Sequence, residues 1–394
     1  MALTNIGFQK TPGRPIEITF AAETGLPDPT QEVLLIGHAA SGTTGINTVV
    51  EINNSGDLTA ASGEAVAKFG AGSELTKMVI AAVRANTGAP SLPQLKCVPL
   101  DSTDTAFGTD DAALTAAGRV KAEYLVSPYD GLDATLRTKL RDTALAMSGA
   151  QRVNNNQYGT IGVVFNRSEV DPSLLPAADT QYLMLGWLPD TGAPAYSIAE
   201  MAAAIAAKTA GNPVPFNPLD NVTVIGVAAP ENMADWITVG AGLESEAALG
   251  QGWTPLSVKP NGDVALVRTV TGRLTVDADG VTPVFAYYDV QDFNVLYFLR
   301  KALFARFNQP DFRQRKASDD TGKDIKSETI RILTTFQDQN MVQKVSELSK
   351  FIQVERNATD RHRFDIKIPT NVIPGLHVIA GNIVATTQFD TVTI

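Results

Sequence analysis

The chain has 394 residues, a formal net charge of −10 and 44% hydrophobic residues, which is enough for packed cores in about two or three domains. Its one cysteine, Cys97, excludes an intramolecular disulfide framework and any multi-cysteine metal site. No apolar stretch approaches the about 20 residues of a membrane span, so we expect no membrane insertion, and the overall acidity argues against direct binding of nucleic acid.

The first part of the chain alternates strand and helix patterns. Residues 1–29 form a low-charge, proline-punctuated arm in which only residues 16–20 (IEITF) alternate like a strand. Residues 32–37 (EVLLIG) are typical of a strand buried on both faces. Further strands are predicted at 94–99, 123–127, 160–165, 182–186 and 222–226, and helices at 63–69, from the N-cap Ser73 onward, 132–147 and 198–209. This order predicts an α/β fold with a largely parallel sheet.

The alternation ends near Trp253, and the C-terminal part is predicted as α+β. Residues 256–276 read as strands with a hairpin turn at Asn261-Gly262. The patterns that follow predict helices at 290–307 and 325–339 and strands at 351–356 and 363–368. The chain closes with an apolar, β-branched segment at 376–394. Both ends therefore look like unpaired strands, which invite pairing with another chain.

The charge is distributed unevenly along the chain. Residues 295–363 hold 14 Lys or Arg and 9 Asp or Glu, a local net charge of +5, so the remainder carries −15. A basic block on an acidic protein indicates a region that meets an acidic partner. The alternative is a solvated helix face of mixed charges.

No catalytic or metal site emerges from the residue spacing. Residues 37–44 (GHAASGTT) follow a buried strand and resemble a phosphate-binding loop, but Thr43 stands where that loop needs a lysine. The three histidines, His38, His362 and His377, have no metal-ligand spacing. We therefore expect no catalytic residues, no cofactor, no metal and no enzyme. A soluble nucleotide-binding α/β enzyme using residues 37–44 is the alternative.

Several segments occur together in one characteristic order. They are PGRPIEITF at 12–20, GLPDPTQEVLLIG at 25–37, KFGAGSELTKMVIAA at 68–82, and then RTVTGRLT, YYDVQDFNVLYFLRKALFARF and KFIQVERNATDRHRFDIKIPTNVIPGLHVIAGNI. In this set and order the chain resembles the tail sheath protein of contractile-tailed bacteriophages, especially the Mu-like group. The resemblance is weak over residues 99–121.

The resemblance implies a domain organisation and a mode of assembly. It implies an N-terminal arm (1–25), an outer α/β domain (26–255), an inner tube-facing domain (256–380) and a C-terminal strand arm (381–394). Subunits of the family stack as hexameric rings around a tail tube, and contraction drives the tube through the host envelope for genome delivery. The arms would pair with sheets of neighbouring subunits through residues such as Ile16, Ile18, Phe20, Ile383, Val384, Phe389 and Val392.

The resemblance also implies the partners and the location. The partners would be further copies of the chain, the tail tube protein, and baseplate and tail terminator proteins. The particle would be a virion tail assembled in the host cytoplasm, or, as an alternative, the sheath of a phage-related bacterial injection machine. The basic block would face the acidic tube, with Lys323, Lys326, Lys344 and Lys350 as candidate contacts.

Overall fold

The structure is a computed structural model of the chain. It describes residues 30–53, 55–87, 92–107, 111–149, 159–167, 171–188, 196–212, 214, 216–226, 244–259, 261–274, 287–360 and 362–376. The predicted arms, 1–25 and 381–394, lie outside the described residues, and with them all the predicted arm contacts: Ile16, Ile18, Phe20, Ile383, Val384, Phe389 and Val392.

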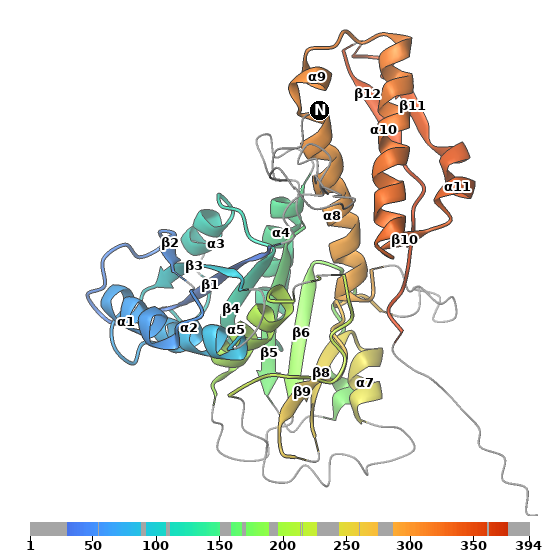
Figure 1. Cartoon of the computed structure of the whole chain (residues 1–394). Helices are drawn as coiled ribbons and strands as arrows, with labels where there is room; N and C mark the ends of the chain where they lie inside the picture. Colours follow the sequence, from blue (N-terminus) through green and yellow to red (C-terminus); the bar gives the residue numbers. More distant parts are fainter. Residues whose placement is uncertain are drawn as a thin grey trace, which may run out of the picture.

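A nine-stranded sheet forms the larger part of the described chain (Figure 1). Its order is β2-β3-β1-β4-β5-β6-β8-β9-β7, and the strands from β3 to β8 pair in parallel. The antiparallel strands are β2, β9 and β7. This confirms the predicted α/β class. The bounds are β1 Glu32–His38, β2 Val50–Ile52, β3 Gln94–Leu100, β4 Tyr124–Asp130, β5 Ile161–Arg167, β6 Leu183–Leu188, β7 Val222–Thr223, β8 Trp253–Val258 and β9 Val264–Leu266.

The sheet has a separate hydrophobic core on each face. Side chains of successive strand residues point to opposite faces, so Val33 and Leu35 of β1 enter one core while Leu34 and Ile36 enter the other. The first core contains residues of α1 (Leu58–Phe69), α2 (Glu74–Ala85) and α5 (Ile198–Ala210). The second contains residues of α3 (Ala112–Ala117), α4 (Ala134–Ser148) and α7 (Glu244–Gly250). Coverage on both faces explains the near-continuous apolar run in β1.

Local capping residues fix where several of these helices begin. Ser73 accepts a hydrogen bond from the backbone N–H of Thr76 at 3.2 Å, as its predicted N-cap role requires. At α5, Ser197 and Glu200 form a reciprocal capping box. Asp57 caps α1, which therefore begins at Leu58 and not at the predicted residue 63.

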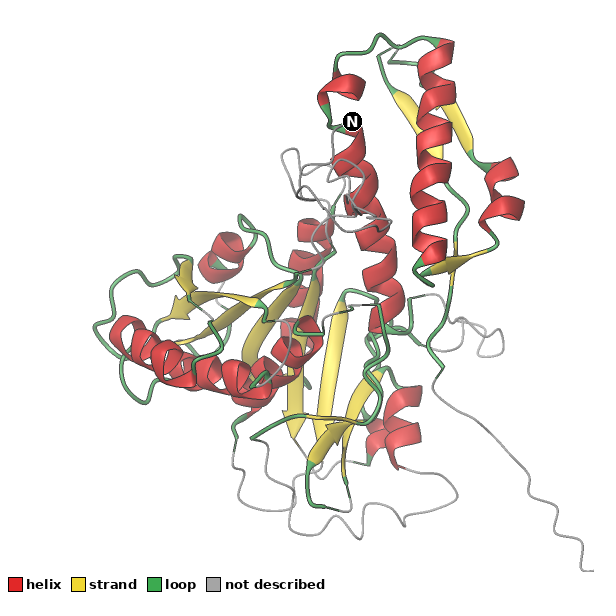
Figure 2. Cartoon of the chain, viewed as in Figure 1, coloured by secondary structure: helices red, strands yellow, loops and turns green. Residues whose placement is uncertain are grey.

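A second unit of helices and short strands stands beside the sheet (Figure 2). Its own core joins α8 and α10 to the short strands and includes Phe336 with 0% exposure. The bounds are α8 Val290–Phe307, α9 Pro310–Arg313, α10 Asp319–Asp338, β10 Val342–Gln343, α11 Val345–Leu348, the 3-10 turn η3 Ser349–Phe351, β11 Gln353–Arg356, β12 Phe364–Lys367 and β13 Asn371–Val372. We call this the helical unit.

Helix α8 attaches the helical unit to the sheet. Asn294 donates a hydrogen bond to the Tyr124 hydroxyl at 3.3 Å, and Arg300 donates to the Ser148 carbonyl at 2.6 Å. Phe293 is buried in the first core of the sheet. One helix thus belongs to both cores and holds the two parts together.

Strand pairing extends the sheet beyond the boundary expected between the outer and inner domains. That boundary, between residues 255 and 256, falls inside β8, which pairs with β6. The hairpin of β8 and β9 then continues the sheet to Leu266. If strand pairing is used to divide the described chain, the helical unit begins with α8 at Val290, because β9, the last described strand before α8, still belongs to the sheet.

Candidate functional site

Residues 37–44 differ from a phosphate-binding loop in their local geometry. The Thr43 hydroxyl donates to the Ala40 carbonyl at 2.7 Å, so it is used within the loop itself. No helix begins directly after the loop, since α1 begins at Leu58. The nearby N-terminus of α2 carries the carboxylate of Glu74, which contacts His38. A phosphate would meet a negative charge here and would lack the lysine that it needs.

His38 is part of a polar contact that joins β1 to α2. Its Nδ1 lies 2.5 Å from Oε2 of Glu74, and the same oxygen accepts from the His38 backbone N–H at 3.2 Å. The Tyr129 hydroxyl lies 3.4 Å from Nε2. The hydrogen bond with Glu74 raises the pKa of His38 above 6.5, against the opposing effect of burial. The pair thus fixes a strand end to a helix start, which is a structural role.

We expect this pair to make stability fall as pH rises above neutral. Because the folded pKa of His38 is raised, its contribution is fully present below about pH 6.5 and is lost as pH rises through the folded value. Unfolding midpoints of wild type and His38→Gln, compared from about pH 6 to pH 8.5, should converge at the alkaline end. Asp292 also titrates in this range, because burial raises its pKa to about 7. Both proteins contain Asp292, so its effect cancels in the difference between their unfolding midpoints. A constant difference across this range would contradict the prediction.

Metal ligation and thiol chemistry find no support among the described residues. Within them, no group of three or more His, Cys, Asp or Glu could hold a metal ion. Burial raises the pKa of the Cys97 thiol, so it is not a reactive thiolate. No described helix combines the length and apolarity needed to cross a bilayer.

The four lysines proposed from the sequence lie at different places on the helical unit. Lys323 is exposed near the start of α10 and donates to Asp320 at 2.9 Å. Lys326 is half-buried and lines a cavity of about 420 Å³ between α10 and the β11–β12 hairpin. Lys344 and Lys350 are exposed on either side of α11. The chain after α10 folds back along the helix, so that Ile352, two residues after Lys350, lines the same cavity as Lys326.

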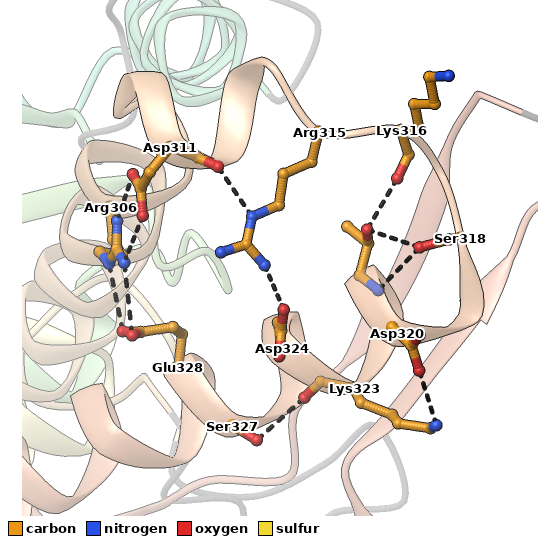
Figure 3. Close-up of polar contacts among 11 residues, drawn as sticks. Arg306, Asp311, Arg315, Lys316, Ser318, Asp320, Lys323, Asp324, Ser327 and Glu328 are labelled. Carbon is orange, nitrogen blue, oxygen red and sulfur yellow. Dashed lines mark hydrogen bonds and ion pairs between the residues drawn. The ribbon is translucent and has the colours of Figure 1, made fainter.

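A network of ion pairs fixes the tip of the helical unit, where α8, α9 and α10 meet (Figure 3). Arg306 donates to both carboxylate oxygens of Asp311 at 2.9 Å and to Glu328 at 3.2 Å. Its guanidinium lies 4.5 Å from the ring centre of Phe312, and that of Arg315 lies 4.7 Å from the same ring. The hydrogen bond with Arg306 lowers the pKa of Asp311. Much of the positive charge at the tip is therefore used internally.

Arg306→Ala should loosen this tip and lower the free energy of unfolding by about 1–2 kcal/mol, because it leaves two carboxylates without their shared partner. Arg306→Lys keeps the charge but cannot reproduce the paired hydrogen bonds, so we expect an intermediate loss. Urea denaturation measures the stability loss of both variants. Hydrogen exchange should rise first in α9. Equal stability of all three proteins would mean that the network is energetically neutral.

The unpaired positive charge is concentrated on a few lysines. The lysines of the helical unit with no carboxylate of the described chain within 4.0 Å include Lys316, Lys326, Lys344, Lys350 and Lys367. Three of these were proposed from the sequence. The other two are Lys316, which precedes the N-cap of α10, and Lys367 of β12, and no sequence pattern distinguishes them from their paired neighbours. Lys323, by contrast, is neutralised locally by Asp320.

Comparison with solved structures identifies the fold. A chain of the anti-feeding prophage (AFP) baseplate matches with a TM-score of 0.61 at 12% identity, over 96% of this chain and 100% of that one. The AFP helical sheath in its contracted state gives 0.59 at 13%, over 96% and 99%. The sheath tail protein of Desulfitobacterium hafniense gives 0.58 at 12%, over 92% and 97%. No family model and no curated protein sequence matches the chain.

The chain has the fold of the sheath proteins of contractile tail systems. The match runs over nearly the whole length of both chains, so it includes the sheet and the helical unit together. The resemblance noted in the sequence is thereby confirmed for the fold. The Mu-like group remains a prediction.

Proposed function

We propose that this chain is the structural subunit of a contractile sheath. The observation that carries the proposal is the fold shared with the contracted AFP sheath over 96% of this chain. In the proposed function, subunits polymerise as stacked hexameric rings around a tail tube. Contraction then drives the tube through a target envelope. Such a sheath is a bistable assembly in which new lateral contacts supply the free energy, and no catalytic step is involved.

The proposed partners follow from the same assembly. Copies of the chain would be linked by their terminal arms, residues 1–25 and 381–394, through strand addition to neighbouring sheets. The tail tube would meet the basic helical unit, and baseplate and tail terminator proteins would close the two ends. Lys326, Lys344 and Lys350 are the better tube-facing candidates, since Lys323 is paired with Asp320.

Two kinds of particle fit the proposal. One is a bacteriophage tail, assembled in the host cytoplasm and carried on the virion for genome delivery. The other is an injection machine, which is supported by the similarity to a chain of an extracellular contractile injection system sheath complex, with a TM-score of 0.57. Capsid and portal genes beside the sheath gene would indicate the phage.

Negative-stain electron microscopy of the purified protein tests the proposal. We expect tubular sheaths of uniform diameter, either spontaneously or after addition of the tail tube protein. A protein that stays monomeric under both conditions would refute it. The enzyme alternative is tested in parallel by thermal shift with ATP and GTP. A rise in melting temperature at micromolar nucleotide would favour that alternative, whereas the geometry around Thr43 leads us to expect none.

A further inference from the structure

Phe351 is the most exposed aromatic residue of the described chain. Its side chain, at the end of η3, is 67% exposed, and the next most exposed aromatic, Tyr287, is 37% exposed. By contrast, Ile352, the next residue along the chain, is 2% exposed and lies in the core of the helical unit. Single exposed apolar residues are common on protein surfaces, so exposure alone does not indicate a binding site. The surroundings of Phe351 decide the matter.

Charged residues lie close to Phe351 along the chain. Lys344 precedes α11, Glu347 lies in α11, and Lys350 and Phe351 lie in η3, which follows directly; all four are exposed. Lys367 is exposed on β12 opposite Gln353, two residues after Phe351. We call Lys344, Glu347, Lys350, Phe351 and Lys367 the Phe351 surface. With three lysines and one glutamate it carries a net charge of +2. A partner that matches it is acidic around an apolar hollow.

This surface is held in place by the core beneath it. Val345 and Ile352, at the two ends of the stretch, are 6% and 2% exposed. The backbone N–H of Val345 donates to the side-chain carbonyl of Gln337 in α10 at 2.9 Å. In Figure 1, α11 lies on the side of α10 away from the sheet, so the surface is clear of the larger part of the molecule. These contacts fix the backbone on both sides of Phe351, which lowers the entropy that the segment loses on binding, a property of interface hot spots.

We propose that Phe351 is the apolar anchor of a docking surface for an acidic protein, the tail tube. This inference rests on the proposed function and adds to it a hydrophobic part of the attachment to the tail tube. Lysines alone predict an attachment that salt abolishes, because exposed charges are screened. A buried aromatic contributes hydrophobic free energy that salt does not screen. Attachment should therefore have a salt-sensitive part, due to Lys344 and Lys350, and a salt-resistant part, due to Phe351.

The experiment is co-sedimentation of the full-length protein with preassembled tail tubes at about 50 mM and about 0.5 M salt. Phe351→Ser should weaken binding about tenfold at both salt concentrations. Lys350→Glu should weaken it at low salt and much less at high salt. Lys344→Gly serves as the matched charge variant, because Lys344 has φ +60°, a backbone conformation that glycine adopts freely. Phe351→Tyr keeps the aromatic body and should bind like wild type.

The outcomes separate this inference from the proposed function. If the wild-type protein forms sheaths and binds tail tubes, and Phe351→Ser binds tail tubes equally well, then the anchor role of Phe351 is wrong and the sheath proposal still holds. Wild-type protein that neither polymerises nor binds tubes would overturn both. If Phe351→Ser forms empty tubular sheaths normally and fails only to hold the tail tube, the anchor is supported. Its melting temperature should match that of wild type, since the side chain is outside the core.

Discussion

Replacing Phe336 with alanine is expected to lower the free energy of unfolding by about 3–5 kcal/mol, because it removes the largest fully buried side chain from the small core of the helical unit. The ring is 0% exposed and lies 5.5 Å from the ring of Phe298. That core contains ten buried residues, far fewer than the cores on the two faces of the sheet. A cavity here has few neighbours that could move to fill it.

Phe351→Ala is the matched control, since it removes the same side chain from an exposed position of the same unit and should change stability by less than about 0.5 kcal/mol. Urea denaturation measures both variants. Hydrogen exchange should locate the effect of Phe336→Ala in α10 and in the β11–β12 hairpin, with the sheet still protected. A loss below about 1 kcal/mol, or equal loosening of the sheet, would contradict an independent core in the helical unit.

Sequence patterns predicted those elements whose own residues define them. Helix α8 has the predicted bounds, because residues 290–307 carry apolar side chains at helical spacing and include no Gly or Pro. Strand β1 was evident because it is covered on both faces and is therefore apolar throughout. The N-cap at Ser73 follows from local chemistry alone and needs no information about distant contacts.

Features that depend on distant contacts could not be read from the sequence. Helix α10 begins at Asp319, six residues before the predicted residue 325. Its first turns are polar, with Gly322 against the ring of Phe364, so they lack the apolar period that indicates a helix. Likewise, β8 and β9 belong to the sheet only because β8 meets β6, which lies far earlier in the chain.

The candidate site shows the same limit. The sequence located the basic block, but which lysines are paired depends on side chains brought together by folding. Lys323 meets Asp320 within α10, whereas Arg315 reaches Asp324 across the tip. Phe351 was expected at the start of a strand and instead ends a 3-10 turn, where its ring is exposed. Residue type and charge therefore indicate a region, and three-dimensional pairing decides which side chains are available to a partner.

Deleting residues 1–20, or residues 383–394, is expected to leave a folded monomer and to abolish tubular sheaths completely. The buried core residues of the described chain lie between Val33 and Ile352, so both truncated proteins keep all of them. If the two ends link neighbouring subunits by strand addition, each deletion breaks the main-chain hydrogen bonds that join copies. Circular dichroism and size-exclusion chromatography check the fold, and negative-stain microscopy checks for tubes.

Point variants in the N-terminal arm separate strand pairing from mere length. Ile18→Pro should act like the deletion, because proline cannot donate to a β-ladder, while Ile18→Val keeps the strand preference and should assemble normally. Normal tubes from both truncated proteins would exclude strand exchange as the link between subunits. The charged surfaces of the helical unit would then have to hold the assembly together, and assembly itself should become sensitive to salt. Strand exchange predicts the opposite, namely tubes that resist salt even where their attachment to the tail tube weakens.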